Sequence, residues 1–320
     1  FKVLERYKER VPCFNDDIQG TGAVVLAGLL SACKKLGQKL SEQRIVVVGA
    51  GAGGVGVARA IQEGLVHEGL NREQARRQMF VMDAAGLVVE EFIEPDSYQQ
   101  PVSQFSSTYA DWSIAGDRPS LMEVLDQAEP TILLGLTGVG GLFSREIIER
   151  MAANCEHPII FPLSNPTANC EAVPEEIIRW TDGKALVAAG SPFGPVDYEG
   201  AMHAIGQGNN AFVFPGIGFA AVLGKCRRIT EAMILESAYA VADYTDKHHL
   251  HKGLFFPPIS DLRNVSLYVT ERVLRVALEE GSSTRTDLDD VDLREYVRSR
   301  AWEAGYMPFM PASSKSEEPG

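Results

Sequence analysis

The sequence contains no long hydrophobic run. Its longest apolar stretch, residues 22–33, is little more than half of the about 20 residues that a membrane-spanning helix requires. Basic residues are also scarce: 30 Lys and Arg stand against 43 Asp and Glu, a formal net charge of −13. Nucleic acid binding needs a Lys/Arg surface that displaces counterions from phosphate, so we do not expect a nucleic acid as partner. The short apolar stretch likewise argues against a membrane as partner. A local basic pocket for a small dicarboxylate is compatible with this total.

Cysteine is sparse and follows no pattern. Five cysteines, an odd number without Cys-x-x-Cys spacing, favour free thiols over a disulfide framework. Free thiols are typical of a reducing compartment, so we expect a cytoplasmic protein. The first eight residues form an amphipathic helical pattern, with neither an initiator Met nor the apolar core of a signal peptide. We therefore expect the chain to be a piece of a longer protein.

Short apolar runs recur along the chain, each separated from the next by a segment long enough for a helix. The 320 residues are 45% hydrophobic, enough for a large core. The alternation predicts an α/β fold, a doubly wound Rossmann-type parallel sheet over residues 17–209, with additional C-terminal helices. Strands are expected at residues 45–48, 79–82, 131–134, 158–163 and 185–188, later helices at 230–246, 261–280 and 287–302, and a frayed end at 313–320.

Two adjacent carboxylates, Asp16 and Asp17, stand directly before the glycine-rich start of the apolar run. A hard divalent cation prefers charged oxygen ligands that are held on stiff backbone. The pair therefore predicts a metal site, with room for a substrate to complete the coordination.

A glycine-rich loop follows the first expected strand, and a helical pattern continues from it. In such a strand–loop–helix unit, Gly49 allows the tight turn, Gly51 permits the close approach of a pyrophosphate, and Gly54 lets helix and strand pack. The N-terminus of the helix offers free N–H groups to phosphate. The loop alone is a weak signal, but this context predicts a dinucleotide site.

Asp83 ends the second expected strand, where a carboxylate can accept hydrogen bonds from both ribose hydroxyls of adenosine and repel a 2′-phosphate. It lies 29 residues after Gly54 rather than about 20, and a helical insertion after Asn71 accounts for the difference. The alternative is that Asp83 caps the turn at residues 84–86.

Asparagines follow two later apolar segments. Asn165, before a proline, is either a simple turn residue or an amide that meets a ligand. Asn209 and Asn210 lie between glycines and an apolar run, which suggests buried amides that need partners. The three histidines at positions 248, 249 and 251 have no acidic or cysteine companion, so a solvated helix end is favoured there over a metal site.

Taken together, these motifs resemble the successive signatures of malic enzymes, in matching order and spacing from the first residue to about residue 258. The segments that carry the resemblance are Phe-Asn-Asp-Asp-Ile-Gln-Gly-Thr at 14–21, the loop at 49–54, Leu-Ser-Asn-Pro-Thr at 163–167, Gly-Ser-Pro-Phe at 190–193, and residues 206–216.

The resemblance implies an NAD-dependent oxidoreductase that decarboxylates L-malate to pyruvate and CO2. Malate would pass a hydride from C2 to the nicotinamide, and a Mn or Mg ion would act as Lewis acid while CO2 leaves. By motif, Asp17 would be the metal ligand and Asp16 its neighbour in the catalytic hydrogen-bond network. The other implied contacts are Thr21, Gly49, Gly51, Gly54 and Asp83 with the cofactor, and Asn165, Asn209 and Asn210 with malate and the nicotinamide end.

The same resemblance also implies catalytic residues for which this chain has no matching motif. In the family, a general-base lysine, a general-acid tyrosine, a malate-binding arginine and two further metal carboxylates lie upstream of the Asp16–Asp17 motif, so we expect the isolated chain to be inactive. Residues 1–16 and 210–283 would belong to the substrate domain, and 284–320 would be a C-terminal extension. NADP-preferring relatives carry a lysine at the position of Gln99, which favours NAD here. A homo-oligomer is expected.

Three other functions are considered. Malolactic enzymes share these motifs but release lactate, and nothing in the sequence separates the two. A non-catalytic NAD-binding or regulatory module is a second alternative. A related amino-acid dehydrogenase is disfavoured because it needs no metal and would not explain Asp16 and Asp17.

Overall fold

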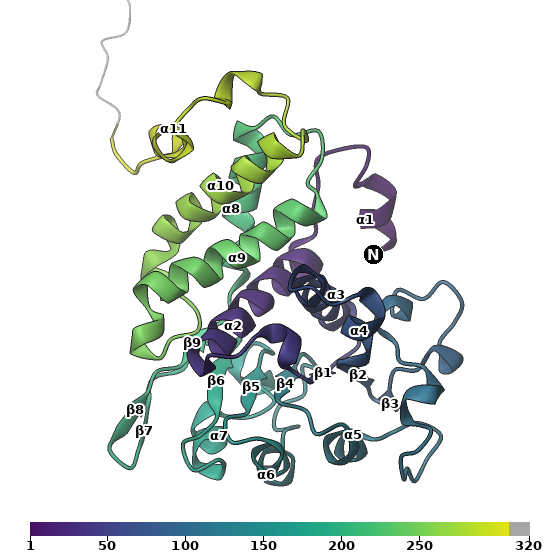
Figure 1. The fold of residues 1–320 in the computed structure, drawn as a ribbon. Helices are drawn as coiled ribbons and strands as arrows, with labels where there is room; N and C mark the ends of the chain where they lie inside the picture. Colours follow the sequence, from purple (N-terminus) through teal and green to yellow (C-terminus); the bar gives the residue numbers. More distant parts are fainter. Residues whose placement is uncertain (307–320) are drawn as a thin grey trace, which may run out of the picture.

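The structure, a computed structural model, describes residues 1–306 and is centred on a seven-stranded sheet (Figure 1). The strand order is β3-β2-β1-β4-β5-β6-β9, and every neighbouring pair is parallel except β2 and β3. The chain order reverses between β1 and β4, which is where doubly wound sheets bind ligands. The bounds are β1 Ile45–Val48, β2 Met79–Asp83, β3 Gly86–Leu87, β4 Ile132–Gly135, β5 Ile159–Pro162, β6 Leu186–Ala189 and β9 Gly206–Gln207.

The predicted α/β fold is confirmed, and all five expected strands form within one residue of their predicted ends. The short strands β3 and β9 were not predicted, because two residues are too few to show a periodicity. A separate hairpin of β7 (Val196–Tyr198) and β8 (Ala201–His203) projects from the side of the molecule beside β6 (Figure 1).

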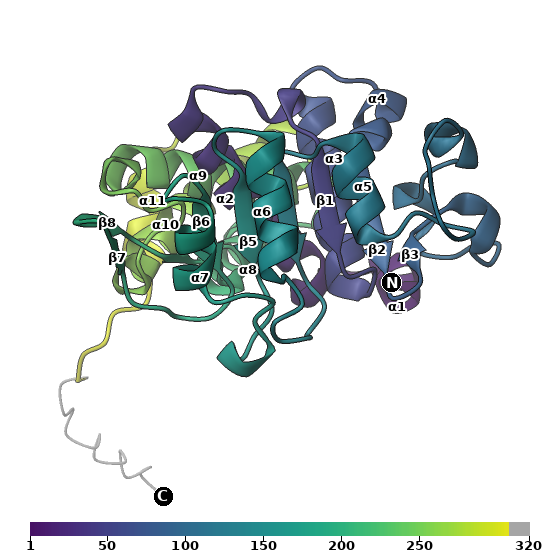
Figure 2. The ribbon, with the colours of Figure 1, turned by 90° about the horizontal axis from the view of Figure 1, so that it is seen from below.

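Helices cover both faces of the sheet, because the side chains of the buried strands alternate between two cores. In β1, Ile45 and Val47 point to one core, and Val46 and Val48 point to the other. The second core is covered by α5 (Leu121–Ala128), α6 (Arg145–Asn154) and α7 (Pro174–Trp180), which lie across the near side of Figure 2. Ser120 caps α5 and Pro174 begins α7, as predicted.

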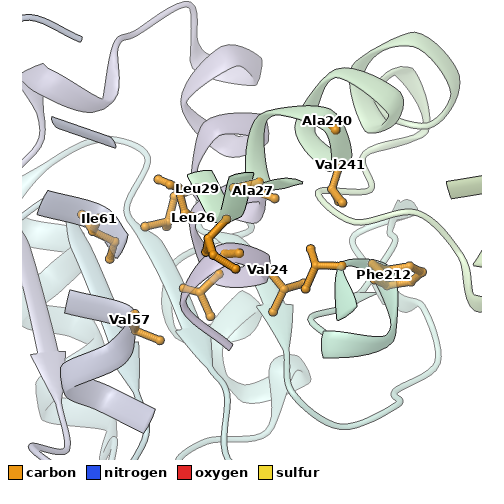
Figure 3. Packing of buried hydrophobic residues seen from close by; sticks show 14 of the residues in the cluster. Val24, Leu26, Ala27, Leu29, Val57, Ile61, Phe212, Ala240 and Val241 are labelled. Atoms are coloured by element: carbon orange, nitrogen blue, oxygen red, sulfur yellow. The ribbon is translucent and has the colours of Figure 1, made fainter. Parts of the chain in front are cut away.

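The first core is organised around α2 (Thr21–Leu36), a helix that is apolar on almost all sides and therefore buried. It packs between α3 (Ala52–His67) and α9 (Glu231–His248) (Figure 3). A Cβ atom at Gly22 would lie 2.7 Å from the Gly56 carbonyl oxygen, so α2 and α3 cross with their backbones nearly in contact. The labelled side chains at this junction are Val24, Leu26, Ala27 and Leu29 of α2, Val57 and Ile61 of α3, Phe212, and Ala240 and Val241 of α9.

The C-terminal helices form a further layer, in which α9 packs directly on α2 and the later helices pack on α9 and on one another (Figure 1). The first two predicted helices form as α9 and α10 (Leu262–Glu279). The predicted helix at 287–302 is wrong in extent: a 3-10 turn ends at Leu288, and α11 (Leu293–Arg300) begins after Asp292. The Asp292 carboxylate accepts hydrogen bonds from the N–H groups of residues 294 and 295. Capping by an acidic side chain is favoured over its place inside a helix. The remaining helices are α1 Lys2–Tyr7, α4 Arg72–Arg77 and α8 Phe214–Leu223.

The predicted domain division at residues 17–209 stays a prediction. One continuous hydrophobic core joins α2 and the sheet to α8, α9 and α10. The predicted frayed end at 313–320 lies outside the described residues. Within residues 1–306, no helix is both long enough and apolar enough to cross a bilayer.

Candidate functional site

The two adjacent carboxylates lie on a short π-helix, Asp16–Gly20, that leads directly into α2. Asn15 caps this turn by accepting a hydrogen bond from the Ile18 N–H at 3.0 Å. A Cβ atom at Gly20 would lie 2.0 Å from Asp16 Oδ1, so the glycine leaves the space that the carboxylate occupies. π-helical turns are rare and are frequently found at functional sites.

Asp16 and Asp17 are placed differently. Asp16 is half-buried, and its Oδ1 is buried without a hydrogen-bond partner among residues 1–306, whereas Asp17 is exposed. Burial raises the pKa of Asp16 above its ordinary range, a hydrogen bond from Asn210 opposes this, and the nearby charge of Asp17 adds to it. A buried carboxylate oxygen without a donor is suited to an electropositive partner.

These residues fit part of a divalent cation site. Residues 1–306 contain no cluster of three or more His, Cys, Asp or Glu side chains that could hold a metal ion by themselves. Asp16 and Asp17 can therefore supply one or two oxygen ligands, and a hexacoordinate ion would need others from substrate, water or another chain segment.

Asn210 ties the carboxylates to the later part of the chain. Its amide group donates to the Asp16 carbonyl oxygen at 3.2 Å, to Asp16 Oδ2 at 3.3 Å and to Thr21 Oγ1 at 3.0 Å. Asn209 instead caps the following 3-10 turn, where its Oδ1 accepts from the Ala211 N–H at 2.9 Å. The two amides, expected to act as a pair, thus have separate local roles, and Thr21 belongs to the Asn210 network.

The glycine loop between β1 and α3 has the geometry of a phosphate-binding turn. Gly49 has a φ of 120°, and a Cβ atom there would lie 2.3 Å from the Leu136 carbonyl oxygen. A Cβ atom at Gly54 would lie 1.7 Å from the Gly49 carbonyl oxygen, so this glycine closes the loop on itself. Gly51 faces open space: in the described part of the chain, no atom beyond its own neighbours lies within 4 Å of an added Cβ. It stands directly before the N–H groups that begin α3.

At the end of β2, Asp83 is paired with a basic side chain. Arg118 donates to both carboxylate oxygens of Asp83, at 3.1 and 3.3 Å. The Asp83 carboxylate is therefore not a free negative charge. Asp83 Oδ1 also accepts from the Ala85 N–H at 2.7 Å, which is the turn cap considered as the alternative. The pair leaves little net charge at this position.

Gln99 lies against the glycine loop. Its amide donates to the Ala50 carbonyl oxygen at 2.9 Å, and the Tyr98 hydroxyl donates to the same oxygen at 3.2 Å. The neutral amide at this position is thus held at the loop that follows β1.

A cavity of about 520 Å3 brings several of the predicted residues together. It lies beyond the carboxyl ends of β5, β6 and β9, where doubly wound sheets place their ligands. The predicted residues in its lining are Asp16, Asn165, Asn209 and Asn210; Asp83 and the glycine loop lie elsewhere along the edge of the sheet. Asp17 is not in the lining, but a Cβ atom at Gly53 of α3 would lie 3.6 Å from its carbonyl oxygen.

Two residues of this region were missed by sequence reasoning. Arg118 sits in an irregular loop that carries no pattern, so no signal identifies it. Glu171 is fully buried and hydrogen-bonded to the ends of two strands. Its signal was present, because it is a lone acid in the apolar run Cys-Glu-Ala-Val at 170–173. The expected solvated helix end without an acidic companion is wrong at His249, which is buried and whose Nε2 lies 2.8 Å from Asp261 Oδ2 just after α9.

Comparisons with known sequences identify the family of the chain. A family profile described as "Malic enzyme, NAD binding domain" matches residues 18–278. Two similar proteins, both described as NAD-dependent malic enzyme, come from Aliivibrio fischeri (43% identical over 307 residues) and Aeromonas hydrophila (41% identical over 311 residues). The matches cover 96% and 97% of this chain but 54% and 55% of the relatives, so the chain spans about half their length.

Solved structures give the same relationship. The malic enzyme of Entamoeba histolytica is similar with a TM-score of 0.75 and 25% identity, over 93% of this chain and 56% of that one. The malic enzyme of Pyrococcus horikoshii Ot3 is similar with a TM-score of 0.72 and 26% identity, over 93% of this chain and 62% of that one.

Proposed function

Since this chain belongs to the malic enzyme family through its NAD-binding domain, we propose that it is the NAD-binding part of an enzyme that oxidises and decarboxylates L-malate to pyruvate and CO2. NAD and a Mn or Mg ion are the proposed cofactors, and a homo-oligomer in the cytoplasm is the proposed assembly. The observation that supports this most directly is the cavity that Asp16, Asn165, Asn209 and Asn210 line together.

Different residues along the edge of the sheet would bind the cofactor, the metal ion and the substrate. The N–H groups at the start of α3 would bind the pyrophosphate, with Gly51 leaving room for it. Asp17 would bind the metal ion, and Asp16 would be held next to it by Asn210. Asn165 can donate to a carboxylate or accept from a carboxamide, which suits both malate and nicotinamide. When bound, the ion would supply Lewis acidity and the nicotinamide a hydride acceptor.

NAD is favoured over NADP by charge. Arg118 is already paired with Asp83, and Gln99 is neutral, so neither of these two residues offers a free cation to a 2′-phosphate. A desolvated phosphate without a cationic partner should lose at least about tenfold in affinity.

Two experiments test the proposal. Calorimetric titration of the 320-residue chain with NAD should show saturable binding, tighter than that of NADP; no binding, or tighter NADP binding, would contradict it. A protein that joins this chain to the upstream half found in its relatives should convert L-malate to pyruvate with Mn, forming one NADH per turnover. Lactate formation without free NADH would instead identify the malolactic alternative.

The isolated chain should turn over malate negligibly. The base and acid that the family resemblance implies lie upstream of Asp16, and proton transfer needs both. Robust turnover by the purified chain would place these groups within its 320 residues and contradict the assignment.

A further inference from the structure

Glu171 is a buried carboxylate that joins the ends of two neighbouring strands. It follows β5 by nine residues, and its side chain is fully buried. Its Oε1 accepts hydrogen bonds from Thr137 N and Thr137 Oγ1, both at 2.8 Å, and from Ser164 Oγ at 2.5 Å. Its Oε2 accepts from Ser164 N at 3.3 Å. Thr137 follows β4 and Ser164 follows β5, so one side chain holds both loops.

The two hydroxyl groups extend this network into the loop backbone. Because each donates its proton to Glu171, each is left as an acceptor. Ser164 Oγ accepts from the Gly138 N–H at 2.8 Å, and Thr137 Oγ1 accepts from the Val139 N–H at 3.0 Å. The carboxylate therefore sets the path of residues 137–139 as well as that of Ser164.

Gly135, which has no side chain, leaves the space that the Glu171 carboxylate occupies. A Cβ atom at Gly135, the last residue of β4, would lie 2.6 Å from the Glu171 carboxyl carbon. The described residues include no ion pair to Glu171, so its charge is balanced by hydrogen bonds alone. Burying a carboxylate is costly unless donors surround it, and an apolar side chain would fill a core position at lower cost. The free-energy cost of burying this carboxylate suggests that the loops after β4 and β5 need a defined geometry.

The position of these loops indicates which part of a dinucleotide they serve. In a doubly wound sheet the two halves of a dinucleotide lie on opposite sides of the switch point, with the adenosine ribose near the end of β2. Here β4, β5 and β6 form the other half. Asn165, which lines the cavity, directly follows the held Ser164.

We propose that Glu171 is a positioning residue for the nicotinamide half of the dinucleotide, which it serves by fixing the loops after β4 and β5 so that Asn165 faces the cavity. This inference rests on the proposed binding of NAD. It predicts that loss of the carboxylate weakens contacts to the nicotinamide ring and leaves the adenosine side, with Gly51 and Asp83, unchanged.

The experiment compares NAD with ADP-ribose, which lacks the nicotinamide, by calorimetric titration of the 320-residue chain. In Glu171→Gln, an amide replaces an acceptor that faces several donors, so the ratio of NAD to ADP-ribose affinity should fall at least about threefold. ADP-ribose affinity should stay within about twofold of the unsubstituted chain. The matched control is Glu175→Gln on the surface of α7, which removes only an exposed pair with Arg179 and should change neither ligand.

Ser164→Ala provides a milder second variant in case Glu171→Gln does not fold. It removes the hydroxyl that links Glu171 to Gly138 and should lower the same ratio. An unchanged ratio in a folded variant, or an equal loss for both ligands, would overturn the positioning role. If the unsubstituted chain binds ADP-ribose and NAD, the proposed NAD binding stands whatever the variants do; if it binds neither, both proposals fail.

Discussion

The two sides of the switch point are built by different means. On the β1–β2 side, the glycine loop is shaped by backbone atoms that, at Gly49 and Gly54, approach too closely for a side chain. On the other side, side chains that are far apart in sequence hold one another: Asp16 and Asn210 are 194 residues apart. The comparison predicts that substitutions which add atoms damage the β1–β2 side, whereas substitutions which remove polar groups damage the side with Asp16 and Asn210.

The largest expected effect lies on the second side. In an enzyme completed by the upstream half, Asp17→Asn should reduce metal-dependent turnover by roughly hundreds to thousands of fold, because an amide supplies a neutral oxygen where the ion needs charge. NAD affinity should stay within about twofold, since the exposed Asp17 side chain lies outside the glycine loop. Turnover against Mn concentration is measured beside an NAD titration, with Asp290→Asn, an exposed surface change, as the control. Normal activity with an unchanged Mn dependence would remove Asp17 from the metal site.

The first side can be tested by a pair of substitutions in one loop. Gly51→Ala adds a methyl group in open space, so the melting temperature should hold while NAD affinity falls by about ten- to a hundredfold, because the methyl group blocks the pyrophosphate. Gly54→Ala forces a methyl group against the Gly49 carbonyl, so it should destabilise the fold by about 1–3 kcal/mol or more. Thermal unfolding and NAD titration of both variants check this. If Gly51→Ala binds NAD normally, the phosphate does not lie at this loop.

The same contrast explains what could be predicted from sequence. The strands, the loop at 49–54 and the cap at Ser120 depend on periodicity and neighbouring residues, so they were predicted closely. The Arg118–Asp83 pair, 35 residues apart, depends on how two loops fold back, and no local pattern encodes that. Asn209 and Asn210 both line the cavity, but Asn209 has a local partner two residues away, whereas the partners of Asn210 are tertiary contacts that no local pattern encodes.

A third prediction concerns the charge at the end of β2. Asp83→Asn keeps an oxygen for the Ala85 N–H but releases the Arg118 guanidinium, which is then free to meet a 2′-phosphate. The preference for NAD over NADP should shift toward NADP by about tenfold, measured as a ratio of dissociation constants. The control is the double variant Asp83→Asn/Arg118→Gln, in which no cation is freed. An equal shift in the double variant would show that Arg118 has no part in the choice.

The smallest expected effect separates the two adjacent amides. Asn210→Ala removes the donor that joins the segment after β9 to Asp16 and Thr21, so the free energy of unfolding should fall by about 1–2 kcal/mol. Asn209→Ala, the matched control, removes a local cap on a 3-10 turn and should cost about half as much or less. Denaturant unfolding of both variants measures the difference.

Equal losses would mean that the Asn210 contacts with Asp16 and Thr21 contribute no more than a single cap. A larger loss for Asn210→Ala, with the glycine loop untouched, would confirm that the carboxylate side is held by contacts between distant segments, because a local cap cannot bring Asp16 and residue 210 together.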